Sequence, residues 1–430
     1  MTSRFQMVEY AIAYVGLLFM SGALNTFLAP QAATSAPLVQ AMGAALGLYS
    51  VLGLLAMRNA TGRIFGLYWF ALIPVVVAAA SMGWTDNLSL SFRRSAGLGL
   101  STAFALWLAL RFTPKQLLGL VVAMAATVIA ASFVVVMAAP SRGIHQAYDL
   151  FAEHHAGSWR GLFGHKNDFG RVASFAASLL MIGFVFRVGG PRLRWGTLAL
   201  VVLAVFMISK SNSSQAILLV ATVPASVLVL LSMRTMMPMT RTVVLISILP
   251  IVVIGVLSAQ LIFEYVLGAL GRDATLTGRT EIWEGVILAL EGNMALGGGF
   301  GAGWEKVRPT IAALTGIDVG HAHNGFLDLA VDIGFVGLAL TLTFLFSVGV
   351  MAFRSLMRGI QPEISTMALA VVIFSLIGNF AGSFLLLHNS IYWVLTVVAF
   401  VQLRDARLGY TPAFTSRRTA AYQSSRWHAA

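Results

Sequence analysis

The stretch QLLGLVVAMAATVIAASFVVVMA, residues 116–138, runs for 23 positions without a charged side chain. A helix rises about 1.5 Å per residue, so this stretch is long enough to cross a hydrocarbon core of ~30 Å. The sequence therefore predicts a transmembrane helix here.

Similar apolar runs recur along all 430 residues, which are 58% hydrophobic and 10% charged, with a mean hydropathy of +0.84. Soluble domains carry roughly a quarter charged residues, so this composition excludes a soluble protein. We predict an all-α polytopic membrane protein with about twelve transmembrane helices, given that each needs ~17–25 residues. The expected spans are 8–28, 38–57, 64–82, 94–111, 116–138, 168–187, 195–210, 215–232, 242–262, 324–350, 366–386 and 390–403.

Four parts are expected along the chain. Helices fill residues 1–262, a large outward loop with short helices spans 263–323, further helices fill 324–403, and a basic tail spans 404–430. The first apolar segment follows only Arg4 and is long for a signal-peptide core, so we interpret it as an uncleaved first helix.

The Lys and Arg residues predict the orientation. Seventeen of the 28 lie in one set of connections, together with three of the 16 acidic residues. Cytoplasmic loops are enriched in Lys and Arg, so both termini are expected in the cytoplasm and the loops 139–167 and 263–323 on the outer side of the membrane. The formal charge of +12 then reflects basic cytoplasmic loops rather than a nucleic-acid partner. The absence of cysteine fits a compartment where a free thiol is a liability.

GHAHNGFLD (320–328) places His321 and His323 at the start of a span. Asp328 and Asp332 follow four residues apart on one helix face, and burying them in lipid is costly, so they should face the bundle. Three interpretations stay open for the histidines. They are a polar pair that ends a loop, a metal site without a clear third ligand, or a general base with a neutral imidazole.

GRTEIW (278–283) places Arg279 on one helix face with Trp283. A guanidinium binds phosphate oxygens bidentately, and an indole stacks on a sugar ring or on the guanidinium. The alternative is a surface Arg–Trp pair. GGGFGAGW (297–304) lacks the dinucleotide fingerprint and predicts a tight turn with close backbone approach.

Two more basic clusters face outward. SWRGLFGHKNDFGR (158–171) holds Arg160 and Lys166, and SKSNSS (209–214) holds Lys210 at the end of a span. A lysine at a helix end often only reaches toward headgroups. Together with Arg279 at one membrane level, these clusters favour a polyanion site.

With these residues placed, the chain resembles the O-antigen ligase and polysaccharide-polymerase superfamily, and within it the exopolysaccharide polymerases of the succinoglycan type. The likeness spans most of the chain and is strongest from Trp159 to Gly337. The ligase-type pattern is met by His323, Asn324 and Gly334, whereas Phe335 stands where ligases favour Thr or Tyr. GLFGHKN (161–167) also looks like the polymerase subgroup.

The resemblance implies roles for three of these residues. It implies that His323 activates the acceptor hydroxyl and that Arg279 holds the lipid pyrophosphate. A second family arginine follows a serine at a span's outer end, where this chain has Ser209 and Lys210.

The implied function is an inverting, metal-independent glycosyltransferase without cofactor. It would join oligosaccharide repeats carried on undecaprenyl pyrophosphate, beside a possible chain-length regulator and a flippase. The alternatives are a ligase that transfers glycan to the lipid A core, or a transporter of the lipid-linked donor. Transporters bind at the membrane midplane, often with inverted repeats, whereas the charges here gather at the outer face. Besides His323 as base, the expected substrate-binding residues are Arg279, Lys210, Arg160, Lys166, His321, Asn324 and Trp283.

Overall fold

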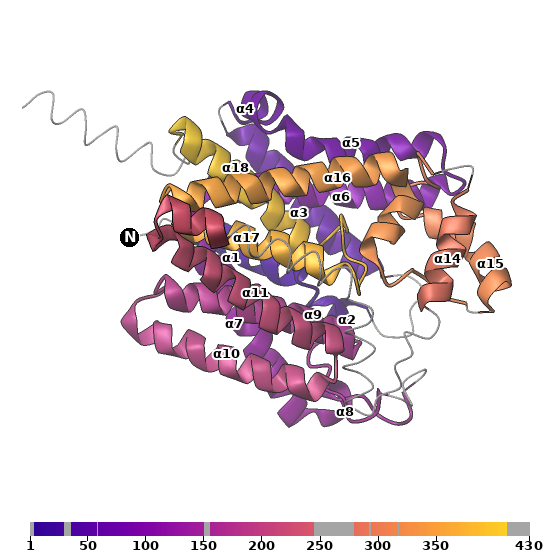
Figure 1. Ribbon diagram of the computed structural model, residues 1–430, viewed down its shortest axis with the longest axis horizontal. Coiled ribbons are helices and arrows are strands. Elements are labelled where there is room, and N and C mark those ends of the chain that lie inside the picture. Colours follow the sequence, from indigo (N-terminus) through magenta and orange to yellow (C-terminus); the bar gives the residue numbers. More distant parts are fainter. Residues whose placement is uncertain are drawn as a thin grey trace, which may run out of the picture.

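The computed structural model describes residues 4–29, 36–57, 59–149, 155–244, 279–291, 294–316 and 318–410, and every regular element among them is helical (Figure 1). The helices are, in chain order, α1 (Arg4–Met20), α2 (Asn25–Leu28), α3 (Pro37–Ala56), α4 (Ala60–Leu67), η1 (Trp69–Leu72), α5 (Ile73–Ala80), η2 (Ser81–Gly83), α6 (Leu88–Arg111), α7 (Pro114–Ala138), α8 (Pro140–Gly143), α9 (Lys166–Val185), α10 (Pro191–Ser211), α11 (Ser214–Ser232), η4 (Met233–Thr235), α14 (Arg279–Ala289), α15 (Gly303–Thr315), α16 (Gly325–Met357), α17 (Pro362–Gly378) and α18 (Ile391–Leu408). The predicted all-α class is confirmed.

The predicted number of spans is not reached in the described part of the chain. Six helices there are long and apolar enough to cross a membrane, or seven if Ala60–Leu67 and Trp69–Gly83, bent by 79°, form one span. Four other helices, α1, α6, α17 and α18, are not among these six. Helices α1 and α17 have 17 residues each, near the lower limit for crossing, and α6 and α18 carry arginines. Most of the predicted span 242–262, the first part of the loop 263–323 and most of the tail 404–430 lie outside the described residues.

The long helices pack into one bundle, in which α9 contacts α7, α10 and α11, while α6 contacts α3 and α18. Helix α18 is buried along almost its whole length. Two buried ion pairs tie distant helices together: Arg111 Nε donates to Glu9 Oε1 over 2.7 Å, and Arg63 Nη2 lies 2.5 Å from Asp405 Oδ2. Both pairs join helix ends that the charge distribution predicts to be cytoplasmic.

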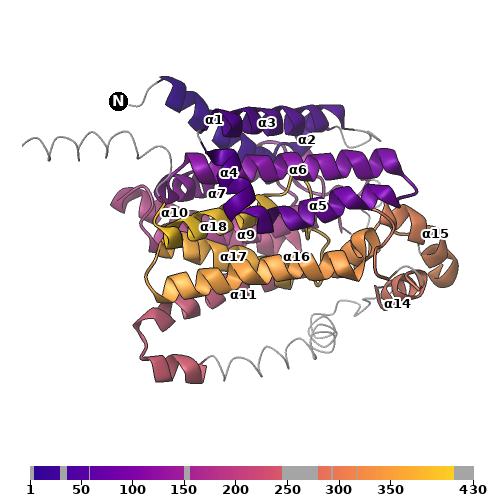
Figure 2. The ribbon, with the colours of Figure 1, turned by 90° about the horizontal axis from the view of Figure 1, so that it is seen from above.

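Helices α14 and α15 lie beyond one end of the bundle in both views (Figure 2). They enclose a small apolar cluster of their own, in which Ile282 and Val286 of α14 and Leu290 just after it meet Val307 and Ile311 of α15. This apolar face, completed by α16, fixes the short helices against the bundle.

The glycine-rich segment 297–303 docks on a break in α16. Ile333 and Gly334 leave the helical conformation, and backbone groups of the segment replace the missing helical bonds. Gly299 N donates to Asp332 O and Phe335 N donates to Met294 O, each over 2.8 Å. Gly334 has φ +69°, and a Cβ there would lie 2.0 Å from the carbonyl oxygen of Ala295. The predicted tight turn with close backbone approach is confirmed.

Candidate functional site

The His321–Ala322–His323 turn, which we call the histidine turn, leads into the N-terminus of α16. Asn324 caps that helix, accepting hydrogen bonds from Phe326 N at 3.0 Å and Leu327 N at 3.3 Å. The two imidazole rings lie with centroids 4.0 Å apart. His321 Nδ1 accepts the backbone N–H of His323 over 3.2 Å, so the neutral His321 ring carries its proton on Nε2.

Burial, reinforced by the nearby positive charges of His321, Arg279 and His165, lowers the pKa of His323 to about 4. The imidazole is therefore neutral near pH 7 and has a free lone pair to accept a proton. Arg279, the first residue of α14, is close enough to influence this ring electrostatically. Burial also lowers the pKa of its guanidinium, which still remains charged. The structure thus brings together the predicted base and the predicted phosphate-binding arginine.

Trp283 makes a contact that the sequence did not indicate, and its expected place at a sugar ring stays a prediction. Its indole Nε1–H donates to the carbonyl oxygen of Ala322 over 2.9 Å, so the polar atom of the indole already has a partner inside the protein. Trp283 therefore connects α14 to the histidine turn.

A second group of histidines, which the sequence analysis did not single out, surrounds the N-terminus of α9. The rings of His145, His155 and His165 lie with centroids 5.2 to 5.9 Å apart. His145 Nε2 accepts from Lys166 N over 3.1 Å, and His165 Nδ1 accepts from Asn167 N over 3.2 Å. Burial, with Arg160 next in effect, lowers the pKa of His145 to about 4. Two neutral imidazoles therefore cap the first N–H groups of α9. The three histidines are spaced ten residues apart in the sequence, but no local pattern indicates that their rings meet.

Arg160, expected to bind substrate, is buried with 4% of its surface exposed. Its Nη1 lies 2.8 Å from Asp149 Oδ2, and its Nε donates to the carbonyl oxygen of Arg142 over 2.9 Å. The guanidinium is thus occupied within the 139–167 loop, and its part in substrate binding stays a prediction.

Lys166 begins α9 and Lys210 lies in the last turn of α10. Lys166 Nζ is 3.5 Å from the carbonyl oxygen of Asn212, just beyond the end of α10. Lys210 is exposed in the last turn of α10, with Nζ 5.7 Å from the centroid of the Phe206 ring. His165 is also near enough to contribute, as the smallest of the causes, to the lowered pKa of His323.

No three or more His, Cys, Asp or Glu side chains in the described ranges are placed to hold a metal ion together. The His321–His323 pair therefore has no third ligand of these types among them.

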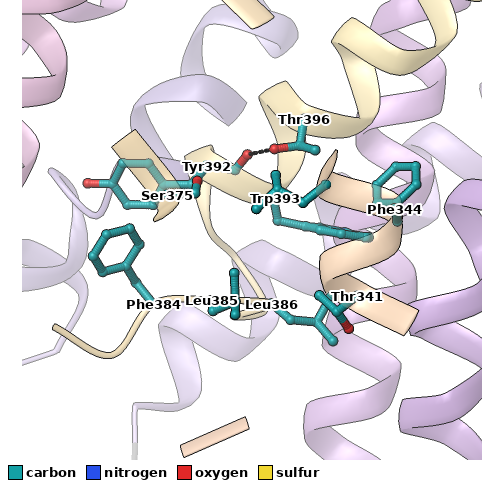
Figure 3. Close-up of a pocket in the computed structure, with 10 residues that line it drawn as sticks. Thr341, Phe344, Ser375, Phe384, Leu385, Leu386, Tyr392, Trp393 and Thr396 are labelled. Atoms are coloured by element: carbon teal, nitrogen blue, oxygen red, sulfur yellow. Dashed lines mark hydrogen bonds between the residues drawn. The ribbon is translucent and has the colours of Figure 1, made fainter. Parts of the chain in front are cut away.

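A narrow pocket, partly open to solvent, lies between α16, α17, α18 and the segment 379–390 (Figure 3). Phe344, Phe384, Tyr392 and Trp393 form much of its wall, and none of its lining residues is charged. This pocket therefore offers no charged group to bind an anion.

Residues 198–342 match the O-antigen ligase family. Over that stretch the chain is similar to the O-antigen ligase family. The exopolysaccharide production protein ExoQ of Rhizobium meliloti (strain 1021) is 30% identical over 194 residues, which are 43% of this chain and 44% of ExoQ. The chain is thus a distant relative of that protein and aligns with less than half of its length. Both matches confirm the resemblance seen in the sequence.

The matched residues 198–342 include Lys210, Arg279 and His323, and the structure explains the spacing of the pattern from His323 to Gly334. Asn324 starts α16 as its cap, and Gly334 supplies the left-handed conformation at the break on which residues 294–303 dock. One helical segment therefore joins the histidine turn to the loop that carries α14 and α15.

Proposed function

We propose that this protein is an inner-membrane glycosyltransferase that polymerises oligosaccharide repeats carried on undecaprenyl pyrophosphate, at the periplasmic face. The observation that supports it most is the pairing of a neutral imidazole, His323, with the permanently charged Arg279 in a region that matches the O-antigen ligase family. The name of the distant relative, an exopolysaccharide production protein, favours polymerisation over transfer to a lipid A core.

In the proposed reaction, a ring nitrogen of His323 takes the proton from the acceptor sugar hydroxyl. The oxygen attacks the anomeric carbon of the donor, and the bond from that carbon to the phosphate oxygen breaks. Undecaprenyl pyrophosphate leaves with the bonding electron pair. In-line displacement inverts the anomeric carbon, so an α-linked donor gives a β-linked product.

Arg279 stabilises the leaving pyrophosphate, because charge grows on its oxygens as the bond breaks and a guanidinium binds two of them at once. Lys210 and Lys166 supply further positive charge. The bound anion also offsets the effect of Arg279 on His323 and so raises the pKa of the imidazole. His323 is then a stronger base when the donor is bound than when the site is empty.

The test uses purified protein in lipid nanodiscs with lipid-linked repeat units, with glycan chain length as the readout. His323→Asn should keep donor binding while turnover falls ~10²–10⁴-fold, the usual contribution of a general base. His321→Ala should be milder. Arg279→Ala should abolish polymer formation, whereas Lys210→Arg should be tolerated. Arg308→Ala is the matched control, because Arg308 lies on the neighbouring α15 in an exposed pair with Asp318, 2.6 Å away.

Other outcomes would assign a different function. Movement of the donor across vesicles without a new glycosidic bond would make the protein a transporter, and transfer to a lipid A core acceptor alone would make it a ligase. Loss of activity in EDTA with recovery in zinc would support a metal site at the histidines.

A further inference from the structure

We propose that Asp328 and Trp283 are positioning residues, which hold the histidine turn in its reactive geometry by binding the two polar backbone atoms of Ala322. The proposal deepens the function proposed above and rests on it. It gives Trp283 a role other than sugar stacking and gives a role to Asp328.

Ala322 is fully buried between the two histidines. Its N–H donates to Asp328 Oδ1 over 2.8 Å, and its carbonyl oxygen accepts from Trp283 Nε1 over 2.9 Å. These partners come from different elements, Asp328 from α16 and Trp283 from α14. A buried backbone group left without a partner costs free energy, so these two bonds strongly select the orientation of the peptide planes on either side of Ala322.

The turn needs such support because its backbone is strained. His323 has φ +52°, in the left-handed region that a non-glycine residue seldom adopts. Strained conformations of this kind persist where the surrounding structure over-determines them, and they gather at functional sites. A third element also contributes, since Ser383 Oγ lies 3.4 Å from His321 Nδ1.

The indole bond also relates the two proposed catalytic groups to each other. Trp283 follows Arg279 by one helical turn on α14, so the bond to Ala322 sets the distance between the guanidinium and the His323 imidazole. A shift of about 1 Å in such a pair reduces turnover by ~10²-fold.

The first experiment compares Trp283→Phe with Trp304→Phe in the full-length protein in nanodiscs. Trp304 is the matched control, because its Nε1 donates to the carbonyl oxygen of Val319 over 2.7 Å, a backbone atom outside the histidine turn. Trp283→Phe should lower kcat by ~10²-fold, and Trp304→Phe should leave it near the wild-type value. Equal effects of the two variants on kcat would show a role in stability only and overturn the proposal.

The second experiment does not depend on glycosyl transfer. Diethyl pyrocarbonate acylates accessible imidazoles, and mass spectrometry gives the rate at His323. This rate should rise roughly two- to tenfold in Trp283→Phe, the change that one lost hydrogen bond produces in a local opening equilibrium, and stay unchanged in Trp304→Phe. If the wild-type protein forms no glycan but the rates differ in this way, the proposed function fails and the positioning role stands.

Asp328 is tested with two substitutions. Asp328→Asn keeps an oxygen that accepts the N–H of Ala322, whereas Asp328→Ala removes it. The acylation rate at His323 should follow the order wild type, Asp328→Asn, Asp328→Ala, with the last the fastest. Equal rates in Asp328→Asn and Asp328→Ala would overturn the role of Asp328, and if Asp328→Ala does not fold, the tryptophan pair decides.

Discussion

At the scale of single residues, His323 combines a left-handed backbone with a pKa lowered to about 4. The causes are structural: burial first, then the charges of His321, Arg279 and His165. A base with such a low pKa is always available near neutral pH but accepts a proton weakly, until a bound anion raises its pKa. In the proposed reaction, donor binding would therefore prepare the base for the acceptor.

A pH profile tests this. With the free protein, kcat/KM should stay level from about pH 8 to about pH 5 and fall as pH drops through about 4, because only neutral His323 is active. The acidic limb of kcat should lie at higher pH, since the donor is then bound. A kcat/KM limb near 6.5, the ordinary value for histidine, would contradict the placement of His323.

Thermal unfolding at each pH provides the control for that profile. The pKa values of His323, His145 and His165 are lowered in the folded state, so the unfolded state binds more protons below about pH 6.5. Stability should therefore be full above that pH and decrease as pH falls toward 4.

Arg160 gives a second prediction at this scale. Its guanidinium pairs with Asp149 in a mostly buried place, so removing either partner leaves the other charge uncompensated. Such a loss lowers the free energy of unfolding by about 3–5 kcal/mol for a fully buried pair, and by less where solvent reaches the pair. Arg160→Ala and Asp149→Ala should both lower the unfolding temperature, and the double variant should be no worse than the more damaging single one. Loss of donor binding in Arg160→Ala alone, with unchanged stability, would instead support the substrate-binding role.

At the scale of elements, the break in α16 decides where the site lies. A continuous helix would have no free backbone groups at residues 331–335, and the segment 294–303 could not dock there. Since that segment leads into α15, which packs on α14, the break also fixes Arg279 relative to the histidine turn.

Gly334→Ala tests the break. A Cβ at Gly334 would meet the carbonyl oxygen of Ala295, and φ +69° is unfavourable for alanine, so we expect a loss of at least ~1–3 kcal/mol of stability. Gly119→Ala in α7 is the matched control, since nothing lies within 4 Å of the added Cβ, and it should stabilise by up to ~1 kcal/mol. Thermal unfolding in detergent measures both. If the Gly334 variant unfolds like the Gly119 variant, the close approach is not required.

At the scale of the whole molecule, α14, α15 and the histidine turn lie at one end of the bundle, and the ion pairs Arg111–Glu9 and Arg63–Asp405 join helix ends predicted to be cytoplasmic. The proposed chemistry needs the first end to face the periplasm, where the lipid-linked donor would be used.

Fusions of alkaline phosphatase, which is active only outside the cytoplasm, test the orientation. A fusion after Gly316 should be active and one after Arg404 inactive, as the bias of Lys and Arg predicts. The reverse pattern would place the site in the cytoplasm and contradict the proposed donor.

The sequence by itself determined the membrane class, the helical positions and the family resemblance, because hydropathy and short motifs are local properties of the chain. It also singled out His323, Arg279 and the glycine turn. Of the twelve spans expected from the sequence, six or seven are matched by helices long and apolar enough to cross a membrane in the described residues, and the full number stays a prediction.

Only the tertiary structure decided the use of each polar side chain. Arg160 pairs with Asp149, Trp283 binds Ala322, and His145, His155 and His165 meet around α9. These contacts join residues separated by loops, and buried polar groups take whichever partner the packing brings within reach. No local pattern specifies that partner, which the packing of distant segments against one another decides.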